Sequence, residues 1–369
     1  MMSQILATDR VELADLQSLC QQALDGGAQS LMVLACDANN CRAEEFDPWL
    51  RSLPVPVFGG IFPQLVHEQA NLERGFIVVS LDETVRTITI GGLSDPHADF
   101  HTTIAEQLDT GDTPASVLFL LDGLASRIGE LLDNVYDHLG SDTVYFGGGA
   151  GSLSFQPGPC LFSNQGMLSD HAQLTILPRR FDLGVEHGWG KLAGPFAVTD
   201  AERNTIRSLD FKPAFEVYRE HVEPSSNQHF TAENFFSIAK AYPFGLEKPD
   251  GQLLVRDPIS RDGDALNCVG EVPANSMIYL LKGHPDKLVA AARRCADRIG
   301  PGREPAILAD CISRVLFLEG DFSRELAAIR AGLGGRPLFG MLTLGEVANG
   351  GGACLEFYNK TSVLAAPGH

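Results

Sequence analysis

Three apolar segments of this chain end on an aromatic residue that is followed directly by glycine. They are Val57-Phe58-Gly59-Gly60, Val144-Tyr145-Phe146-Gly147 and Pro337-Leu338-Phe339-Gly340. Short apolar runs bounded by turn residues are typical of strands that are buried on both faces. Glycine permits backbone conformations that are closed to other residues. The recurrence therefore predicts that one strand-end geometry is used three times.

Strand and helix patterns alternate along the chain. Continuous apolar runs predict strands at 30–36 and 115–121, and apolar residues at helical spacing predict helices at 12–24, 128–139 and 286–299. The 369 residues exceed the size at which a single core usually stops growing, about 250–300 residues. The predicted fold is α/β to α+β, with two lobes that each hold a mostly buried mixed sheet covered by helices.

The charge balance argues against nucleic acids and membranes as partners. The chain has 28 lysines and arginines against 47 aspartates and glutamates, a net charge of −19 at pH 7, which repels phosphate backbones and anionic lipids. Neither a run of about 18 apolar residues nor an N-terminal signal pattern is present, so we expect a cytoplasmic protein. The eight cysteines include no C-x-x-C pair, which favours buried thiols in a reducing compartment.

Familiar catalytic and phosphate-binding motifs are absent. The glycine tract Gly147–Gly151 follows a predicted strand but matches neither G-x-G-x-x-G nor G-x-x-x-x-G-K-[ST]. No G-x-S-x-G sequence is present, and no nucleophile–base pair or metal-ligand set stands out. We therefore expect a protein that is not an enzyme.

The stretch Gly184–Gly190, at the middle of the chain, is the first candidate for a ligand site. It places His187 beside Trp189, one of two tryptophans, and Phe196 follows shortly after. An imidazole next to a large aromatic ring can lie in a pocket with an apolar wall. The alternative is a histidine that packs in the core and binds no ligand.

A second set of candidates lies in the C-terminal half. Tyr242 precedes a predicted strand that ends at Arg256, whose guanidinium can bind a carboxylate through two hydrogen bonds. Glu346 forms a polar cluster at strand ends with Asn359 and Thr361. These residues either line a pocket or pair with one another to fix turns.

The order of short motifs resembles that of a known family over nearly the whole chain. The matching segments are Val144–Gly151, His187–Trp189, Tyr242–Gly245, Val255–Asp257, Gly270–Pro273, Gly345-Glu346 and Asn359–Thr361. In this order they resemble the FIST family of bacterial sensory proteins. The resemblance implies an N-terminal FIST domain at 29–210, after a helix and lead-in at 1–28, and a C-terminal FIST domain at 211–364. The tail at 365–369 is expected to be frayed.

The resemblance also implies a function in signal transduction. The chain is similar to stand-alone members of the family that bind haem, sense nitric oxide and regulate a separate partner in two-component signalling. That partner is a sensor histidine kinase or a diguanylate cyclase or phosphodiesterase of cyclic-di-GMP signalling. On this hypothesis the cofactor is haem b, His187 ligates the haem iron, and Trp189 and Phe196 line the slot, while a cysteine or tyrosine ligand stays open. Nitric oxide would weaken or displace the protein ligand and alter the surface presented to the partner.

The alternative hypothesis is a haem-free sensor of amino-acid-like small molecules, a ligand class that is also associated with the family. Arg256 would then bind the ligand carboxylate, Glu346 would face its amine, and Tyr242 would complete the pocket. The oligomeric state, including a homo-oligomer, is left open.

Overall fold

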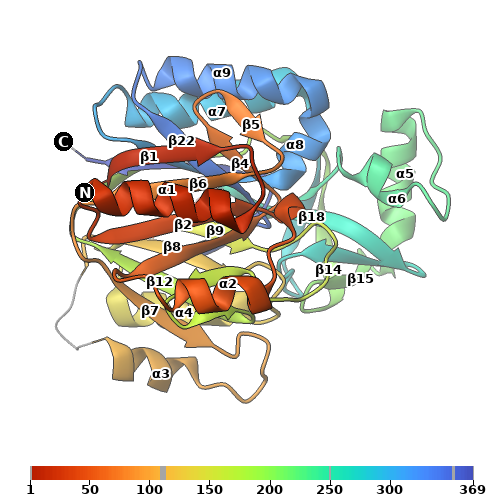
Figure 1. The fold of residues 1–369 in the computed structure, drawn as a ribbon. Coiled ribbons are helices and arrows are strands. Elements are labelled where there is room, and N and C mark those ends of the chain that lie inside the picture. Colours follow the sequence, from red (N-terminus) through yellow and green to blue (C-terminus); the bar gives the residue numbers. More distant parts are fainter. Residues whose placement is uncertain (1, 109–113, 249–250, 351–353, 369) are drawn as a thin grey trace.

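The computed structural model describes residues 2–108, 114–248, 251–350 and 354–368 (Figure 1). We call residues 190–282 the barrel, because their strands close on themselves, and the remainder the body. The strands of the body form three sheets, with helices packed on their outer faces.

The body contains three copies of one arrangement, in the order strand, helix, strand, helix, strand, hairpin, strand. The first repeat comprises β1 (Met2–Thr8), α1 (Leu13–Asp25), β2 (Ser30–Cys36), α2 (Ala43–Leu50), β3 (Val57–Phe62), the hairpin β4 (Gln64–His67) and β5 (Ala70–Leu72), and β6 (Phe76–Leu81). The second comprises β7 (Arg86–Gly91), α3 (Phe100–Gln107), β8 (Ser116–Asp122), α4 (Ile128–Leu139), β9 (Val144–Ala150), the hairpin β10 (Leu161–Ser163) and β11 (Gly166–Leu168), and β12 (His171–Leu177). The third comprises β13 (Phe181–Glu186), α7 (Pro285–Ile299), β21 (Ala306–Cys311), α8 (Ile312–Leu318) with α9 (Phe322–Gly332), β22 (Leu338–Thr343), the hairpin β23 (Glu346–Ala348) and β24 (Glu356–Tyr358), and β25 (Ser362–Pro367).

The three sheets share one strand order. In the described residues they run β1-β6-β2-β3-β10-β11, β7-β12-β8-β9-β23-β24 and β13-β25-β21-β22-β4-β5. The central pairs β2–β3, β8–β9 and β21–β22 are parallel. The hairpin of each repeat joins the sheet of another repeat, so that β4 pairs with β22, β10 with β3, and β23 with β9. The N-terminal and C-terminal halves of the chain therefore share sheets.

The aromatic–glycine segments lie in β3, β9 and β22, the second strand of each parallel pair. Gly59 faces Val33, Gly147 faces Phe119, and Gly340 faces Leu308. A Cβ atom on any of the three glycines would overlap the backbone of the facing residue. The prediction that the strands end at the aromatic residue is wrong, because β3, β9 and β22 continue through the glycine. The glycines instead allow a close approach of two strands.

The three sheets pack around a common apolar core. Phe58, Phe146 and Phe339, the aromatic residues that precede the glycines, belong to this core and are at most 1% exposed. Burying one such side chain stabilises the fold by about 1.5–3 kcal/mol relative to leaving it exposed. The repeated sequence pattern therefore marks the centre of the body.

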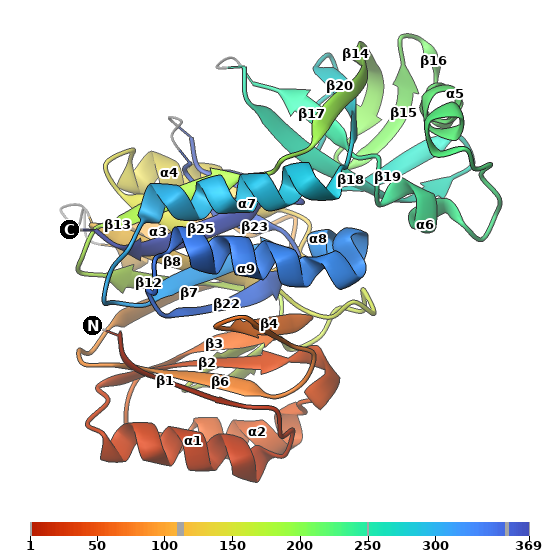
Figure 2. The same cartoon turned by 90° about the horizontal axis from the view of Figure 1, so that it is seen from above.

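The barrel is inserted into the third repeat, between β13 and α7, and projects from the body (Figure 2). Its elements are β14 (Gly190–Glu202), β15 (Thr205–Leu209), β16 (Lys212–Pro213), α5 (Ala214–Ser226), α6 (Phe235–Ala239), β17 (Phe244–Glu247), β18 (Leu253–Asp262), β19 (Ala265–Val269) and β20 (Met277–Lys282). The strand order β14-β20-β17-β18-β19-β15 returns to β14 and closes the ring. The chain enters and leaves the barrel through 187–189 and 283–284, so one end of the barrel is held against the third repeat.

The predicted class, mixed sheets covered by helices, is confirmed, and the predicted helices at 12–24, 128–139 and 286–299 correspond to α1, α4 and α7. The expectation of a frayed tail is wrong for its first residues, because β25 extends to Pro367 and pairs with β13. Ala365 and Ala366 are at most 1% exposed, while His369 lies outside the described residues. In the described part of the chain, no helix has the length and apolar character needed to cross a membrane.

Candidate functional site

The turn between β24 and β25 is polar and enclosed. Asn359, Lys360 and Thr361 are 0%, 0% and 2% exposed. The strand residues that face the three glycines pair, on their other side, with Leu364, Val78 and Leu174. These three residues therefore occupy matched positions, and the repeats can be aligned through them. This alignment matches Asn359 with Glu73 and Ser169, which are both exposed. Burial of a polar turn is therefore particular to the third repeat, where the barrel is inserted.

Lys360 connects this turn to the barrel. Its Nζ lies 3.1 Å from Oδ2 of Asp257 on β18 and donates to the carbonyl oxygen of Lys240 at 3.0 Å. Ser313 at the start of α8 donates to the same Asp257 oxygen at 2.8 Å. The Lys360 ammonium also lies 4.9 Å from the centre of the Trp189 ring, a distance at which a cation is attracted to the ring face. The turn, α8 and the barrel thus meet at one buried ion pair.

Polar atoms without partners lie at this junction. Both Asn359 side-chain atoms, Oδ1 and Nδ2, and Oδ1 of Asp257 are buried and have no hydrogen-bond partner among the described residues. Leaving a buried polar group unpaired costs about 1–3 kcal/mol, so native proteins rarely do so without a reason. Burial raises the pKa of Asp257, and Lys360 opposes that rise. These three atoms leave hydrogen-bonding capacity at the junction unused among the described residues.

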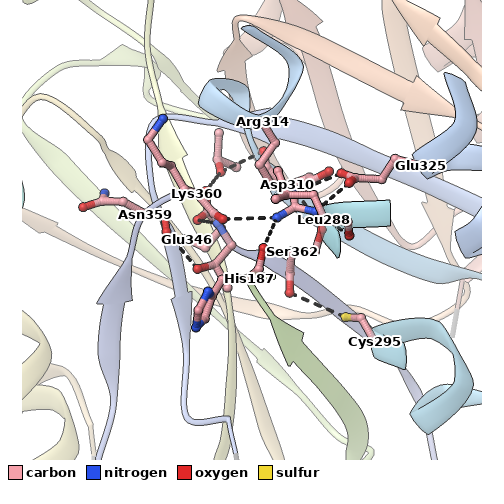
Figure 3. Close-up of polar contacts among 12 residues, drawn as sticks. His187, Leu288, Cys295, Asp310, Arg314, Glu325, Glu346, Asn359, Lys360 and Ser362 are labelled. Carbon is pink, nitrogen blue, oxygen red and sulfur yellow. Dashed lines mark hydrogen bonds and ion pairs between the residues drawn. The ribbon is translucent and has the colours of Figure 1, made fainter. Parts of the chain in front are cut away.

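A second buried cluster, centred on Arg314, lies on the other side of the turn (Figure 3). The Arg314 guanidinium contacts Oδ1 of Asp310 at 3.2 Å and Oε2 of Glu325 at 2.5 Å, and all three side chains are fully buried. It also donates to the carbonyl oxygens of His187 at 2.7 Å and Lys360 at 3.2 Å. Figure 3 shows the Asn359 and Lys360 side chains leaving the turn away from this cluster. Arg314 therefore holds the backbone of the turn at the Lys360 carbonyl oxygen, on the side opposite to the Asn359 and Lys360 side chains.

The cluster carries more acid than base. Burial, and then the nearby Glu325, raise the pKa of Asp310 well above its usual value. Burial likewise raises the pKa of Glu346, which accepts from the Thr343 hydroxyl at 2.7 Å and from the Thr361 backbone N–H at 3.2 Å. Within the described residues Glu346 has no cationic partner. Burial therefore favours the neutral form of both acids, and the charges of Arg314 and Glu325 balance each other.

The chain matches two family profiles. The FIST N domain matches residues 30–212, and the FIST C domain matches residues 214–349. The chain belongs to the FIST family. FIST domains are sensor domains of signal transduction and are generally not enzymes. No curated protein matches the sequence.

Both FIST domains contribute to the barrel and to the junction. The FIST N match ends at β16 and the FIST C match begins at α5, so their boundary lies inside the barrel. His187 and Trp189 come from the FIST N match, whereas Asp257 and Arg314 come from the FIST C match. Asn359 and Lys360, in the β24–β25 turn, lie outside both matched ranges.

The structure brings His187 and Trp189 to the junction and places Phe196 elsewhere. Nδ1 of His187 accepts from the Trp189 backbone N–H at 3.0 Å, and the Trp189 ring packs against Phe317 with centroids 5.0 Å apart. Phe196 instead is half-buried and packs against the barrel core, with its ring 5.3 Å from that of His221. Burial, and then the positive charge of Arg314, lower the pKa of His187 to about 4. His187 is therefore neutral near pH 7.

Of the second set of candidates, Arg256 and Tyr242 have structural contacts. Arg256 donates from Nε to the carbonyl oxygen of Glu271 at 2.7 Å and from Nη1 to that of Phe357 at 3.0 Å, which ties β18 to β24. Tyr242 is buried in the barrel core, and its carbonyl oxygen accepts from the Tyr218 hydroxyl at 2.8 Å. Glu346 lies beneath the turn, where it accepts from the Thr361 backbone N–H.

The central residues of the junction were only partly visible in the sequence. Asn359 and Thr361 stood out as polar residues at strand ends, but Lys360, Asp310, Arg314 and Glu325 did not. The available signal was an ionisable residue inside an apolar run, as with Asp310 in Ala306–Cys311. Such a residue is almost never fully buried unless it is paired.

Proposed function

We propose that this FIST protein is a sensor whose ligand binds at the junction of the body and the barrel, at Asn359 and Asp257. The observation that supports this is the Asn359 amide, which is fully buried with both polar atoms unpaired among the described residues. In the two matching turns the side chains are exposed and can bond to water. Asn359 is fully buried and has lost that option.

The ligand that best complements these atoms is an amino-acid-like zwitterion. Its ammonium group would donate to Oδ1 of Asp257 and Oδ1 of Asn359, and its carboxylate would accept from Nδ2 of Asn359. In this proposal Arg256 keeps the barrel in place rather than binding the ligand carboxylate.

The three residues predicted to hold haem, His187, Trp189 and Phe196, are not arranged as a haem slot. Trp189 is packed between Phe317 and the Lys360 ammonium, and Phe196 packs against the separate core of the barrel. His187, Trp189 and Phe196 therefore do not line one cavity.

Signalling would follow from the way the barrel is attached. A ligand that bridges the β24–β25 turn and β18 holds the barrel against the body, because these elements belong to different parts of the fold. A ligand can shift a conformational equilibrium only by its difference in affinity for the two states. A signalling partner would read the position of the barrel, and the family resemblance implies a histidine kinase or a cyclic-di-GMP enzyme in that role.

The test is a thermal-stability screen of the purified protein with each of the twenty standard amino acids. A ligand present at about 100 times its Kd stabilises the native state by about 2.7 kcal/mol. We expect at least one amino acid to raise the Tm of the wild type and of Ser169→Leu, which alters the exposed matching turn, but not of Asn359→Leu. Asp257→Asn serves as a second variant. Stabilisation that persists in both Asn359→Leu and Asp257→Asn would reject the site, and an absence of stabilisation in the wild type would reject this ligand class.

A further inference from the structure

Arg336, which follows α9, is a second buried group without adequate partners. It is 3% exposed, and its Nε and Nη1 atoms have no hydrogen-bond partner among the described residues. Its remaining contact is a long one of 3.4 Å from Nη2 to the carbonyl oxygen of Pro301. A buried cation is normally paired or fully hydrogen-bonded, because removing its charge from water is costly.

The repeat does not require an arginine here. Gly340, Gly59 and Gly147 are matched positions, so Arg336 corresponds to Val55 in the first repeat and Thr143 in the second. Both of these side chains are uncharged. The same strand and helix arrangement therefore forms twice without a guanidinium at this position.

A second arginine lies next to Arg336. Arg330 on α9 donates from Nη1 to the carbonyl oxygen of Arg336 and pairs from Nη2 with Oε2 of Glu68 at 2.8 Å. Its Nε is also buried and without a partner among the described residues. Glu68 balances the charge of Arg330, whereas no carboxylate in the described part of the chain forms an ion pair with Arg336. The pair therefore offers three unpaired nitrogen atoms, which carry four N–H groups, and an uncompensated charge.

Glycine backbone covers the Arg336 guanidinium. Gly302 packs directly on it, and a Cβ atom at Gly302 would overlap the guanidinium nitrogens. Gly334 and Gly335, which directly precede Arg336 in the chain, are exposed and have φ values of +57° and +94°. At Gly302, therefore, backbone alone covers the guanidinium.

A purely structural role for Arg336 does not explain its unpaired nitrogen atoms. The helices α7 and α9 both end nearby, at Ile299 and Gly332, and a cation is stabilised at helix C-termini by about 0.3–1 kcal/mol. That role is best filled when the N–H groups bond the last carbonyl oxygens. Two of the three guanidinium nitrogens make no such bond.

We propose that Arg336 and Arg330 form a binding site for an oxyanion, either a carboxylate or a phosphate group. A guanidinium presents a planar fork that binds either group through two hydrogen bonds, and it remains charged at all relevant pH values. The site lies at the opposite ends of α7 and α9 from the junction. Leu288 and Glu325, near the starts of these helices, contact Arg314, whereas their C-termini lie beside Arg336. The site is therefore separate from the ligand site at the junction and does not depend on it.

The experiment measures the Tm of the full chain in sodium chloride, sodium phosphate and sodium acetate at equal ionic strength. We expect saturable stabilisation by phosphate, acetate or both relative to chloride, and the arm that responds identifies the anion class. Arg336→Val, which introduces the residue of the first repeat, should abolish this response without lowering the Tm in chloride. Arg303→Gln, which removes an exposed arginine from the same segment, should retain it.

Two outcomes would overturn the proposal. One is a wild type that responds equally to all three salts, and the other is a saturable response that survives in Arg336→Val. If Arg336→Val fails to fold, Arg336→Lys keeps the charge and removes the planar fork. It should weaken anion binding at least tenfold, and unchanged binding would reject the site.

Discussion

The Nζ of Lys360 lies 3.1 Å from the carboxylate of Asp257, and both side chains are buried at the junction of the body and the barrel. Lys360 belongs to the turn that ends the third repeat, whereas Asp257 belongs to the barrel inserted within that repeat. Trp189, at the entry to the barrel, donates from its indole N–H to the carbonyl oxygen of Lys360 at 3.0 Å. The same residue thus holds the barrel by its side chain and the entering chain by its backbone.

Replacement of Lys360 by methionine should lower the free energy of unfolding by about 3–5 kcal/mol at pH 7, because it leaves the Asp257 carboxylate buried and unpaired. Burial already raises the pKa of Asp257 and Lys360 opposes this, so the pKa should rise further in the variant. The loss should therefore shrink at low pH, where Asp257 is protonated. Urea unfolding at pH 7 and pH 5 measures both values, and an equal loss at the two pH values would contradict the pairing. Lys360→Met with Asp257→Asn should lose less than the sum of the single variants.

The sequence predicted the centre of the body better than the junction. The aromatic–glycine segments depend on neighbouring residues and on strand periodicity, so Phe58-Gly59 and Phe146-Gly147 could be recognised as a repeated device. Their role as close strand contacts, rather than strand ends, required the partner strands. Lys360 and Asp257 are about a hundred residues apart and meet only because the barrel is an insertion. No local pattern reports such a contact.

The three residues predicted to hold haem show the same limit of local sequence patterns. His187 and Trp189 are two residues apart and do lie together at the junction. Phe196 follows by seven positions on an extended strand, β14, which carries it into the barrel and away from both. Nearness in sequence was a reliable guide within a turn but not along a strand, where each residue advances by about 3.3 Å.

Replacement of Gly147 by alanine should destabilise the protein by about 3–5 kcal/mol, because a Cβ atom would overlap the Phe119 backbone and the residue has a φ of +144°. Gly158→Ala is the matched control, since nothing lies within 4 Å of its Cβ position. That variant should remain within about 0.5 kcal/mol of the wild type. Urea denaturation of both proteins makes the comparison, and similar midpoints would show that the strands do not approach as closely as described.

Replacement of Arg314 by methionine should cost about 3–5 kcal/mol, because two carboxyl groups would lose their shared cation. Adding Glu325→Gln should recover a large part of this loss, since burial raises the pKa of the remaining acid, Asp310, and favours its neutral form. The measurement is a double-mutant cycle from urea unfolding at pH 7. If the double variant is no more stable than Arg314→Met alone, Glu325 is not the main partner of the arginine.

His187 should make the folded protein sensitive to mild acid. Its pKa is lowered from an unfolded value of about 6.5 to about 4, so the folded state binds fewer protons than the unfolded state between these values. Its contribution is therefore complete above about pH 6.5 and is lost as the pH falls towards 4, by about 3 kcal/mol in total. His187→Asn keeps an acceptor for the Trp189 N–H but cannot titrate, so its unfolding free energy should fall less over this range. Urea unfolding of the two proteins from pH 7 to pH 4.5 gives the difference, and parallel curves would mean that His187 titrates at its ordinary value.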